Sequence, residues 1–162
     1  GAALAHNHSV GAKSWTGSAK IDTEDLSKCN FTFSVPVNDL EVDSATFRKL
    51  AGIADQGQPS ESERKDIRAN MLAEGQLNAK KFNTISFEST ACSKDGIKGK
   101  FTLRGKTNDV SIPVKMDVGE QVSIKGQFDI KSTDYGFEAY SIMFGQIANK
   151  ETMTIVFDIK SK

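Results

Sequence analysis

A two-residue alternation of apolar and polar side chains is the feature that most limits how this chain can fold. Phe31, Phe33 and Val35 are separated by polar residues, and a period of two places them on one face of an extended segment. Each such segment is expected to be a strand with one wet and one dry side. Several strands of this kind, joined by short turns, form an antiparallel sandwich or barrel. The alternation recurs in segments 100–104, 110–118, 122–130 and 153–160.

The connections between these strands are short and rich in glycine, asparagine and aspartate. They lie at residues 94–96, 104–109 and 118–120, and their residue types tolerate the positive φ angles of tight turns. Short connections predict that strands adjacent in sequence are also adjacent in the sheet. Pro113 lacks an N–H group, so we expect it at an edge or bulge, where no ladder hydrogen bond is needed.

Residues 41–80 interrupt the alternation and predict a helical insertion. Ser44 is placed to cap a short helix that runs to Leu50, and residues 51–58 have the composition of a loop.

A second helix is expected to begin at residue 60. Ser60 and Glu63 form the Ser-x-x-Glu pattern of a capping box. The charged side chains of this helix mostly face water. A thin apolar stripe suits a helix that lies across a barrel mouth or along its wall, and it consists of Ile67, Met71 and Leu72.

These patterns predict a mainly β fold, an antiparallel β-barrel of about eight strands with a helical insertion near residues 44–75. We expect residues 1–9 to form a flexible N-terminal segment and residues 10–162 to form the barrel domain. A chain of 162 residues fits one domain with one sizeable core.

The charge balance excludes two kinds of partner. Lys plus Arg and Asp plus Glu each number 21, so the formal net charge is zero. A nucleic-acid-binding protein needs an excess of basic side chains, and a neutral chain has no strong attraction to an anionic membrane. The apolar runs are short, so no segment is expected to span a bilayer.

Two features bear on export. Ala3-Leu4-Ala5 has the small-x-small pattern that precedes signal cleavage, and it reads either as the end of a removed secretory signal or as a cloning remnant or ordinary flexible N-terminus. The chain has two cysteines, Cys29 and Cys92, an even count that favours one disulfide in an exported protein.

Strand parity tests this disulfide. If the segments that contain the cysteines pair antiparallel, the start of one lies beside the end of the other, which supports the bridge. Cys29 shares parity with inward-facing Phe31, whereas Cys92 has the parity opposite to Ile85 and Phe87. A bridge therefore requires a β-bulge or a frayed strand end.

The barrel interior is predicted to be apolar. Its inward residues are mostly Phe, Ile, Val and Met, and we identify no inward charge. Phenylalanine, with ten copies, fills an interior without requiring a hydrogen bond. A small antiparallel barrel either fills with side chains or encloses one ligand. The residues alone leave both alternatives open and favour the filled core.

Several motifs, in a fixed order, resemble the YceI family over residues 35–162. They comprise a charged helical stretch, the strand that follows it, a glycine-containing hairpin region and a segment before the last strand, with one further match near the N-terminus. The matching segments are DIRANML (66–72), KFNTISFES (81–89), GKFTLRGKTNDVSIPV (99–114), STDYGF (132–137) and GSAKID (17–22).

This resemblance implies a lipocalin-like barrel in an exported or periplasmic bacterial protein. Relatives in the family bind long isoprenoid or other amphiphilic lipids in a tunnel along the barrel axis. The resemblance therefore shifts the expectation from a filled core to a cavity. We expect a periplasmic or secreted protein whose partner is an isoprenoid, quinone or fatty-acid type of lipid, and we leave a homodimer open.

The chain departs from the family in two places. Only His6-Asn7-His8-Ser9 precedes the first glycine-containing strand, so the family's additional N-terminal strand is short or missing. The stretch from residue 114 to 131 is compact. Both differences bear on the length of ligand that the barrel holds.

The candidate ligand-binding residues are inward-facing strand residues together with side chains expected at the mouth. Met71, Leu72, Phe82 and Phe144 are the expected mouth or lid residues, and residues 137–144 are expected to fold over one barrel end as a loop or short helix. The full set is Phe31, Phe33, Val35, Met71, Leu72, Phe82, Ile85, Phe87, Phe101, Leu103, Phe128, Tyr135, Phe137 and Phe144.

Some polar residues have two interpretations. Tyr135 either meets a ligand head group or packs at a strand start, and the packing role is favoured. Arg68, Arg104 and Lys106 are candidate head-group partners, although such a residue is more often a solvated charge.

No catalytic set and no cofactor is expected. The only histidines, His6 and His8, lie near the N-terminus, and no nucleophile–base arrangement can be assembled from the remaining residues. The leading hypothesis is a non-enzymatic lipid carrier or scavenger. One alternative is a filled barrel that acts through surface contacts with proteins. The other is a copper or nickel site formed by His6 and His8.

Overall fold

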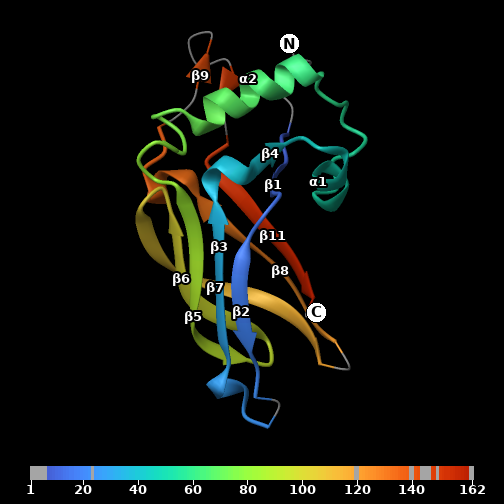
Figure 1. The fold of residues 1–162 in the computed structure, drawn as a ribbon, viewed down its shortest axis with the longest axis vertical. Helices are drawn as coiled ribbons and strands as arrows, with labels where there is room; N and C mark the ends of the chain where they lie inside the picture. The colour runs from blue at the N-terminus through green and yellow to red at the C-terminus, as the bar shows by residue number, and fades with distance from the viewer. Residues whose placement is uncertain are drawn as a thin grey trace.

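A curled antiparallel sheet is the main element of the structure, which is a computed structural model that describes residues 7–22, 24–118, 121–138, 141–142, 147–148 and 150–160. The sheet has seven strands in the order β11-β8-β7-β6-β5-β3-β2 (Figure 1). Its strands are β2 (Thr16–Lys20), β3 (Asn30–Pro36), β5 (Thr84–Ser93), β6 (Gly96–Leu103), β7 (Lys106–Val118), β8 (Val122–Lys131) and β11 (Thr152–Lys160).

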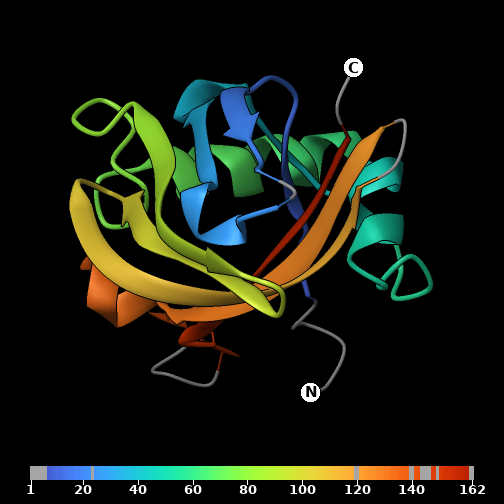
Figure 2. The ribbon, with the colours of Figure 1, turned by 90° about the horizontal axis from the view of Figure 1, so that it is seen from below.

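Seen along the strands, the sheet curls around its apolar face as a half-barrel (Figure 2). This confirms the predicted mainly β, antiparallel, barrel-type fold with a helical insertion. Within the described residues, the edge strands β2 and β11 share no ladder, so one side of the curl is open.

The N-terminal strand is short, as expected from the sequence. β1 (Val10–Ala12) pairs with β4 (Leu40–Val42) in a separate two-stranded sheet. Just before it, Ser9 is buried and its backbone N–H donates to Asp43 Oδ1 at 2.9 Å. Near the C-terminus, β9 (Ser141–Ile142) pairs with β10 (Ile147–Ala148).

Both predicted helices form, and both begin at the predicted caps. The Ser44 hydroxyl accepts from Phe47 N–H to start α1 (Ala45–Leu50). Ser60 and Glu63 form a complete capping box at the start of α2 (Glu61–Leu72). α2 lies across one end of the strands (Figure 1). Over the described residues, no helix is long and apolar enough to cross a membrane.

The described residues also include three short 3₁₀ turns: η2 (Leu26–Lys28), η3 (Val37–Asp39) and η4 (Ser132–Tyr135).

The β6–β7 turn is tighter than the sequence indicated. It consists of Arg104 and Gly105 alone, with φ of 51° and 71°, because β7 already begins at Lys106. Two residues with positive φ form a type I′ turn, which matches the twist of the strands on either side.

Pro113 lies where two ladders end. It is paired with Gly96 at the last position of the β6–β7 register, and the β7–β8 register begins at the next residue, Val114. This agrees with the expectation that proline occupies a place where no ladder hydrogen bond is required.

The disulfide and the bulge that it requires are both present. Cys29 and Cys92 are bonded, with their Cα atoms 6.0 Å apart. The β5–β6 register shifts between Ser89 and Ala91, so one extra residue reverses the parity of the strand. As a result Cys92 faces inward and is buried, on the same side as Phe87.

A buried ion pair lies outside the barrel wall, and no sequence pattern predicted it. Asp43 and Arg48 are both fully buried, and Arg48 Nη1 is 2.8 Å from Asp43 Oδ1. Arg48 Nη2 also donates to the carbonyls of Ile53 and Gly57, which fixes the loop after α1.

Candidate functional site

The concave face of the sheet carries a set of apolar side chains that are only partly buried. We call this set of side chains the apolar trough. Each member lies on the same face as the buried core and packs against it. The trough consists of Phe33 and Val35 on β3, Ile85 on β5, Val110, Val114 and Met116 on β7, Val122 on β8, and Met153, Ile155 and Phe157 on β11.

The floor beneath the trough is made by buried aromatic and aliphatic side chains. Phe101 meets Phe128 edge to face at a centroid distance of 5.5 Å and Tyr135 at 5.8 Å. Phe33 stacks on Phe87 at 5.5 Å, so the trough and the floor are in direct contact. Aromatic pairs of this kind stabilise the floor beyond their buried area alone.

The trough is partly exposed because of the residues at the sheet edge. On β2, Gly17 is opposite Phe33 and Ala19 is opposite Phe31, so both face the concave side. These residues are too small to cover their neighbours, and β2 is exposed along its whole length. At the other edge, the inward side of β11 is only half-buried.

The predicted ligand-binding residues fall into three groups. Some are buried in the floor, namely Phe31, Phe87, Phe101, Leu103, Phe128 and Tyr135. Others are partly exposed, namely Phe33, Val35, Met71, Leu72, Phe82, Ile85 and Phe137. Phe144 lies outside the described residues.

Seven of the ten trough residues, all on β7, β8 and β11, are absent from the predicted site. Val114, Met116, Ile155 and Phe157 were recognised as inward strand residues but were not proposed as site residues. Their signal was the same alternation as in β3 and β5. Only the structure shows that they remain partly exposed.

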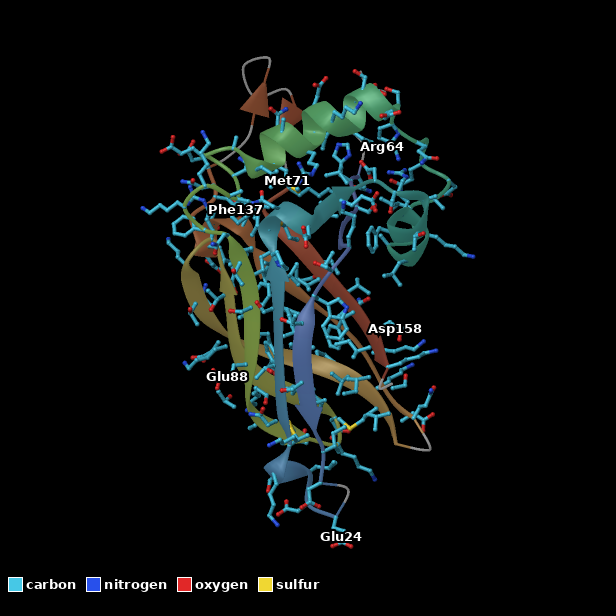
Figure 3. All side chains as sticks on the ribbon, viewed as in Figure 1. Glu24, Arg64, Met71, Glu88, Phe137 and Asp158 are labelled. Atoms are coloured by element: carbon cyan, nitrogen blue, oxygen red, sulfur yellow. A yellow bond between two sulfur atoms is a disulfide. The ribbon has the colours of Figure 1, made fainter. Side chains whose placement is uncertain are left out.

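A second apolar group lies at the end covered by α2, opposite the end where Glu24 lies (Figure 3). It contains Met71, Leu72, Phe82 and Phe137, and we call it the mouth cluster. Arg104 is held within it, with its guanidinium carbon 5.9 Å from the Phe82 ring centre and 6.0 Å from that of Phe137.

The candidate head-group residues differ in their contacts. Arg68 donates to the carbonyls of Asn38 and Leu40, so it ties α2 to the chain around β4. Arg104 donates to the carbonyls of Glu74 and Gly136.

The other two candidates differ in burial. Tyr135 is buried, and burial raises its pKa above the ordinary value. Lys106 is exposed at the start of β7.

Two clefts are present besides the open side of the sheet, and the first reaches Val110 of the trough. One, of about 440 Å³, opens beyond Pro113, where residues 108–110 of β7 separate from residues 129–131 of β8. The other, of about 370 Å³, lies between α2 and residues 56–59 and includes His8.

The proposed histidine metal site is not assembled in the described part of the chain. His8 Nδ1 lies 2.6 Å from Asp43 Oδ2, and His6 lies outside the described residues. Among the residues that the structure describes, no group of three or more His, Cys, Asp or Glu side chains is arranged to hold a metal ion.

A curled antiparallel sheet with an apolar concave face and a helix across one end defines a protein of the open β-barrel class. The model of the YceI-like domain matches residues 3–161, and the chain belongs to this family. The resemblance inferred from the motifs is thereby confirmed.

Solved structures share the fold at low sequence identity. Burkholderia cenocepacia BcnA superposes with a TM-score of 0.70 at 16% identity, over 96% of this chain and 95% of that one. The Campylobacter jejuni YceI protein gives 0.68 at 10% identity, over 98% and 86%. A mutant YceI crystallised with a monobromobimane guest gives 0.69 at 10% identity, again over 98% and 86%. No curated protein matches the sequence.

Proposed function

We propose that the chain is a non-enzymatic, periplasmic or secreted protein that binds an apolar or amphiphilic lipid in the apolar trough, as a carrier or scavenger. The observation that carries this proposal is the partial exposure of the trough on the open side of the sheet. Apolar side chains that share one face of the sheet and are left half-covered fit an extended hydrocarbon chain.

The expected ligand is long and has few polar groups. Each methylene buried against the trough contributes about 0.8 kcal/mol, so a chain of isoprenoid, quinone or fatty-acid type binds without many hydrogen bonds. Membership of the YceI-like family supports this class of ligand.

A first experiment is organic extraction of the purified protein followed by mass spectrometry. We expect a co-purified isoprenoid, quinone or fatty acid. A protein that yields no lipid and binds none of these three classes in titrations would contradict the proposal.

A matched pair of variants on β11 tests the location. Ile155 faces the trough, whereas its neighbour Val156 is 40% exposed on the opposite face. Ile155→Glu is expected to weaken binding by more than about tenfold, because a carboxylate would lose its hydration against the hydrocarbon chain. Val156→Glu is expected to bind like the parent.

Titration calorimetry measures both affinities, and circular dichroism checks that both variants are folded. Equal affinity of the two variants would place the ligand elsewhere.

A further inference from the structure

We propose that Arg104 and Lys106 bind the oxyanion head group, a phosphate or carboxylate, of the amphiphile whose chain lies in the trough. This inference rests on the proposed function and narrows its ligand class from lipids in general to anionic ones. It places the head group at the end of the barrel covered by α2.

Two cations converge on one backbone position. A Cβ atom placed on Gly136 would lie 3.0 Å from Lys106 Nζ and 3.1 Å from Arg104 Nη1. Gly136 has a φ of 73° and no side chain, so the space beside its carbonyl is left to the two cationic groups. Like charges on the same side of Gly136 repel each other, and an anion between them would relieve that repulsion.

Among the described residues, acidic groups lie near these cations without pairing with them, and the Glu138 carboxylate lies beside Gly75. Within the part of the chain that the structure describes, neither Arg104 nor Lys106 forms an ion pair, although Asp134 and Glu138 flank Gly136 in the sequence. Arg104 Nε is buried without a hydrogen-bond partner. The other guanidinium nitrogens donate to the carbonyls of Gly136 and Glu74, which holds the side chain in place.

The surroundings of the pair match an amphiphile. The rings of Phe82 and Phe137 flank the Arg104 guanidinium, and both belong to the mouth cluster. Lys81 Nζ also lies 5.3 Å from the centre of the Phe82 ring and adds positive charge at this end. An anionic group between these cations would have apolar surface immediately beside it, where a hydrocarbon chain can continue.

The test compares geranylgeranyl phosphate with geranylgeraniol, two ligands with the same chain and different heads, by titration calorimetry. The parent protein is expected to bind the phosphate about tenfold more tightly, since hydrogen bonds to charged groups are worth more than neutral ones. Raising the salt concentration should shrink this preference. Equal affinity for the two ligands would overturn the proposal.

Lys106→Gln is the primary variant, because Lys106 is exposed and its side chain makes no bond that the fold needs. It is expected to lose most of the preference for phosphate while binding geranylgeraniol like the parent. Lys98→Gln, on β6, removes an exposed lysine elsewhere and should leave the preference intact. A preference that persists in Lys106→Gln and in the double variant Arg104→Gln, Lys106→Gln would overturn the proposal.

A titration with inorganic phosphate distinguishes a lipid head group from a free phosphate as the anion that the site binds. If the site binds a lipid head group, inorganic phosphate should bind far more weakly than geranylgeranyl phosphate. The changes that inorganic phosphate causes in the NMR chemical shifts of the backbone amides near Gly136 should disappear in Lys106→Gln. Inorganic phosphate that binds as tightly as geranylgeranyl phosphate would reject a lipid head group. Failure of both lipids to bind, while inorganic phosphate still shifts these amides, would reject the proposed function and leave a free-anion site.

Discussion

At the scale of single residues, the Asp43–Arg48 pair is a buried ion pair, and each of its charges needs its partner in order to be buried at low cost. Burial alone would raise the pKa of the Asp43 carboxyl. The N–H of Ser9, the His8 ring and the Arg48 guanidinium outweigh burial and hold that pKa below its usual range. A buried charge that loses its partner is strongly destabilising, so these contacts hold the N-terminal segment and α1 together.

Asp43→Asn is expected to lower the free energy of unfolding by about 3 kcal/mol at neutral pH, because it leaves Arg48 buried without a counter-charge. Urea denaturation measures this difference. The folded pKa is lowered, so the stabilisation is present above the unfolded pKa of 3.8 and is lost as the pH falls through the folded value. The gap between parent and variant should therefore close in acid.

Asp55→Asn is the matched control, because Asp55 is exposed. If Asp43→Asn and Asp55→Asn have the same stability at neutral pH, the buried pair contributes nothing.

At the scale of elements, the bulge in β5 and the disulfide depend on each other. The bulge turns Cys92 inward, and the bond then ties the end of β5 to the residue before β3. The bond closes a long loop that contains both helices, which restricts the unfolded chain.

Reduction of the disulfide is expected to lower the free energy of unfolding by about 4 kcal/mol, the value for a loop of this length. The cysteines are separated by 63 residues. Urea titrations with and without reductant measure the loss. The double variant Cys29→Ala, Cys92→Ala should not respond to reductant, and an equal response in both proteins would show that the reductant acts elsewhere.

At the scale of the whole molecule, the open side of the half-barrel governs access to the trough. Strands β2 and β11 are the sheet edges, and each pairs on one side only within the described residues. Edge strands open more readily than central ones, since they have fewer hydrogen bonds to break.

Lipid binding is expected to slow amide hydrogen exchange most at residues 16–20 and 152–160. A chain in the trough would contact the inward side of β11 and cover the concave side of β2, so both edges would open less often. Exchange in β6, which is paired on both sides, serves as the internal reference. Uniform protection across all strands would argue against binding at the open side.

The sequence by itself determined the class of fold, because a period of two leaves few alternatives to a half-buried strand. It also determined both helix starts, since the caps at Ser44 and Ser60 act within a few residues. Parity is also a local property of a strand, so the sequence showed that a Cys29–Cys92 bond requires a bulge or a frayed strand end, and the structure has the bulge.

Only the tertiary structure decided how far the sheet closes and which apolar side chains remain exposed. Alternation shows that Phe87 and Ile155 face inward, but not that one is buried and the other half-exposed. The same holds for the Asp43–Arg48 pair and for the cations at Gly136. Asp43 and Arg48 are close in sequence, but the contacts of Asp43 with His8 and Ser9, like that of Arg104 with Gly136, join segments more than 30 residues apart. No local pattern reports where such segments meet.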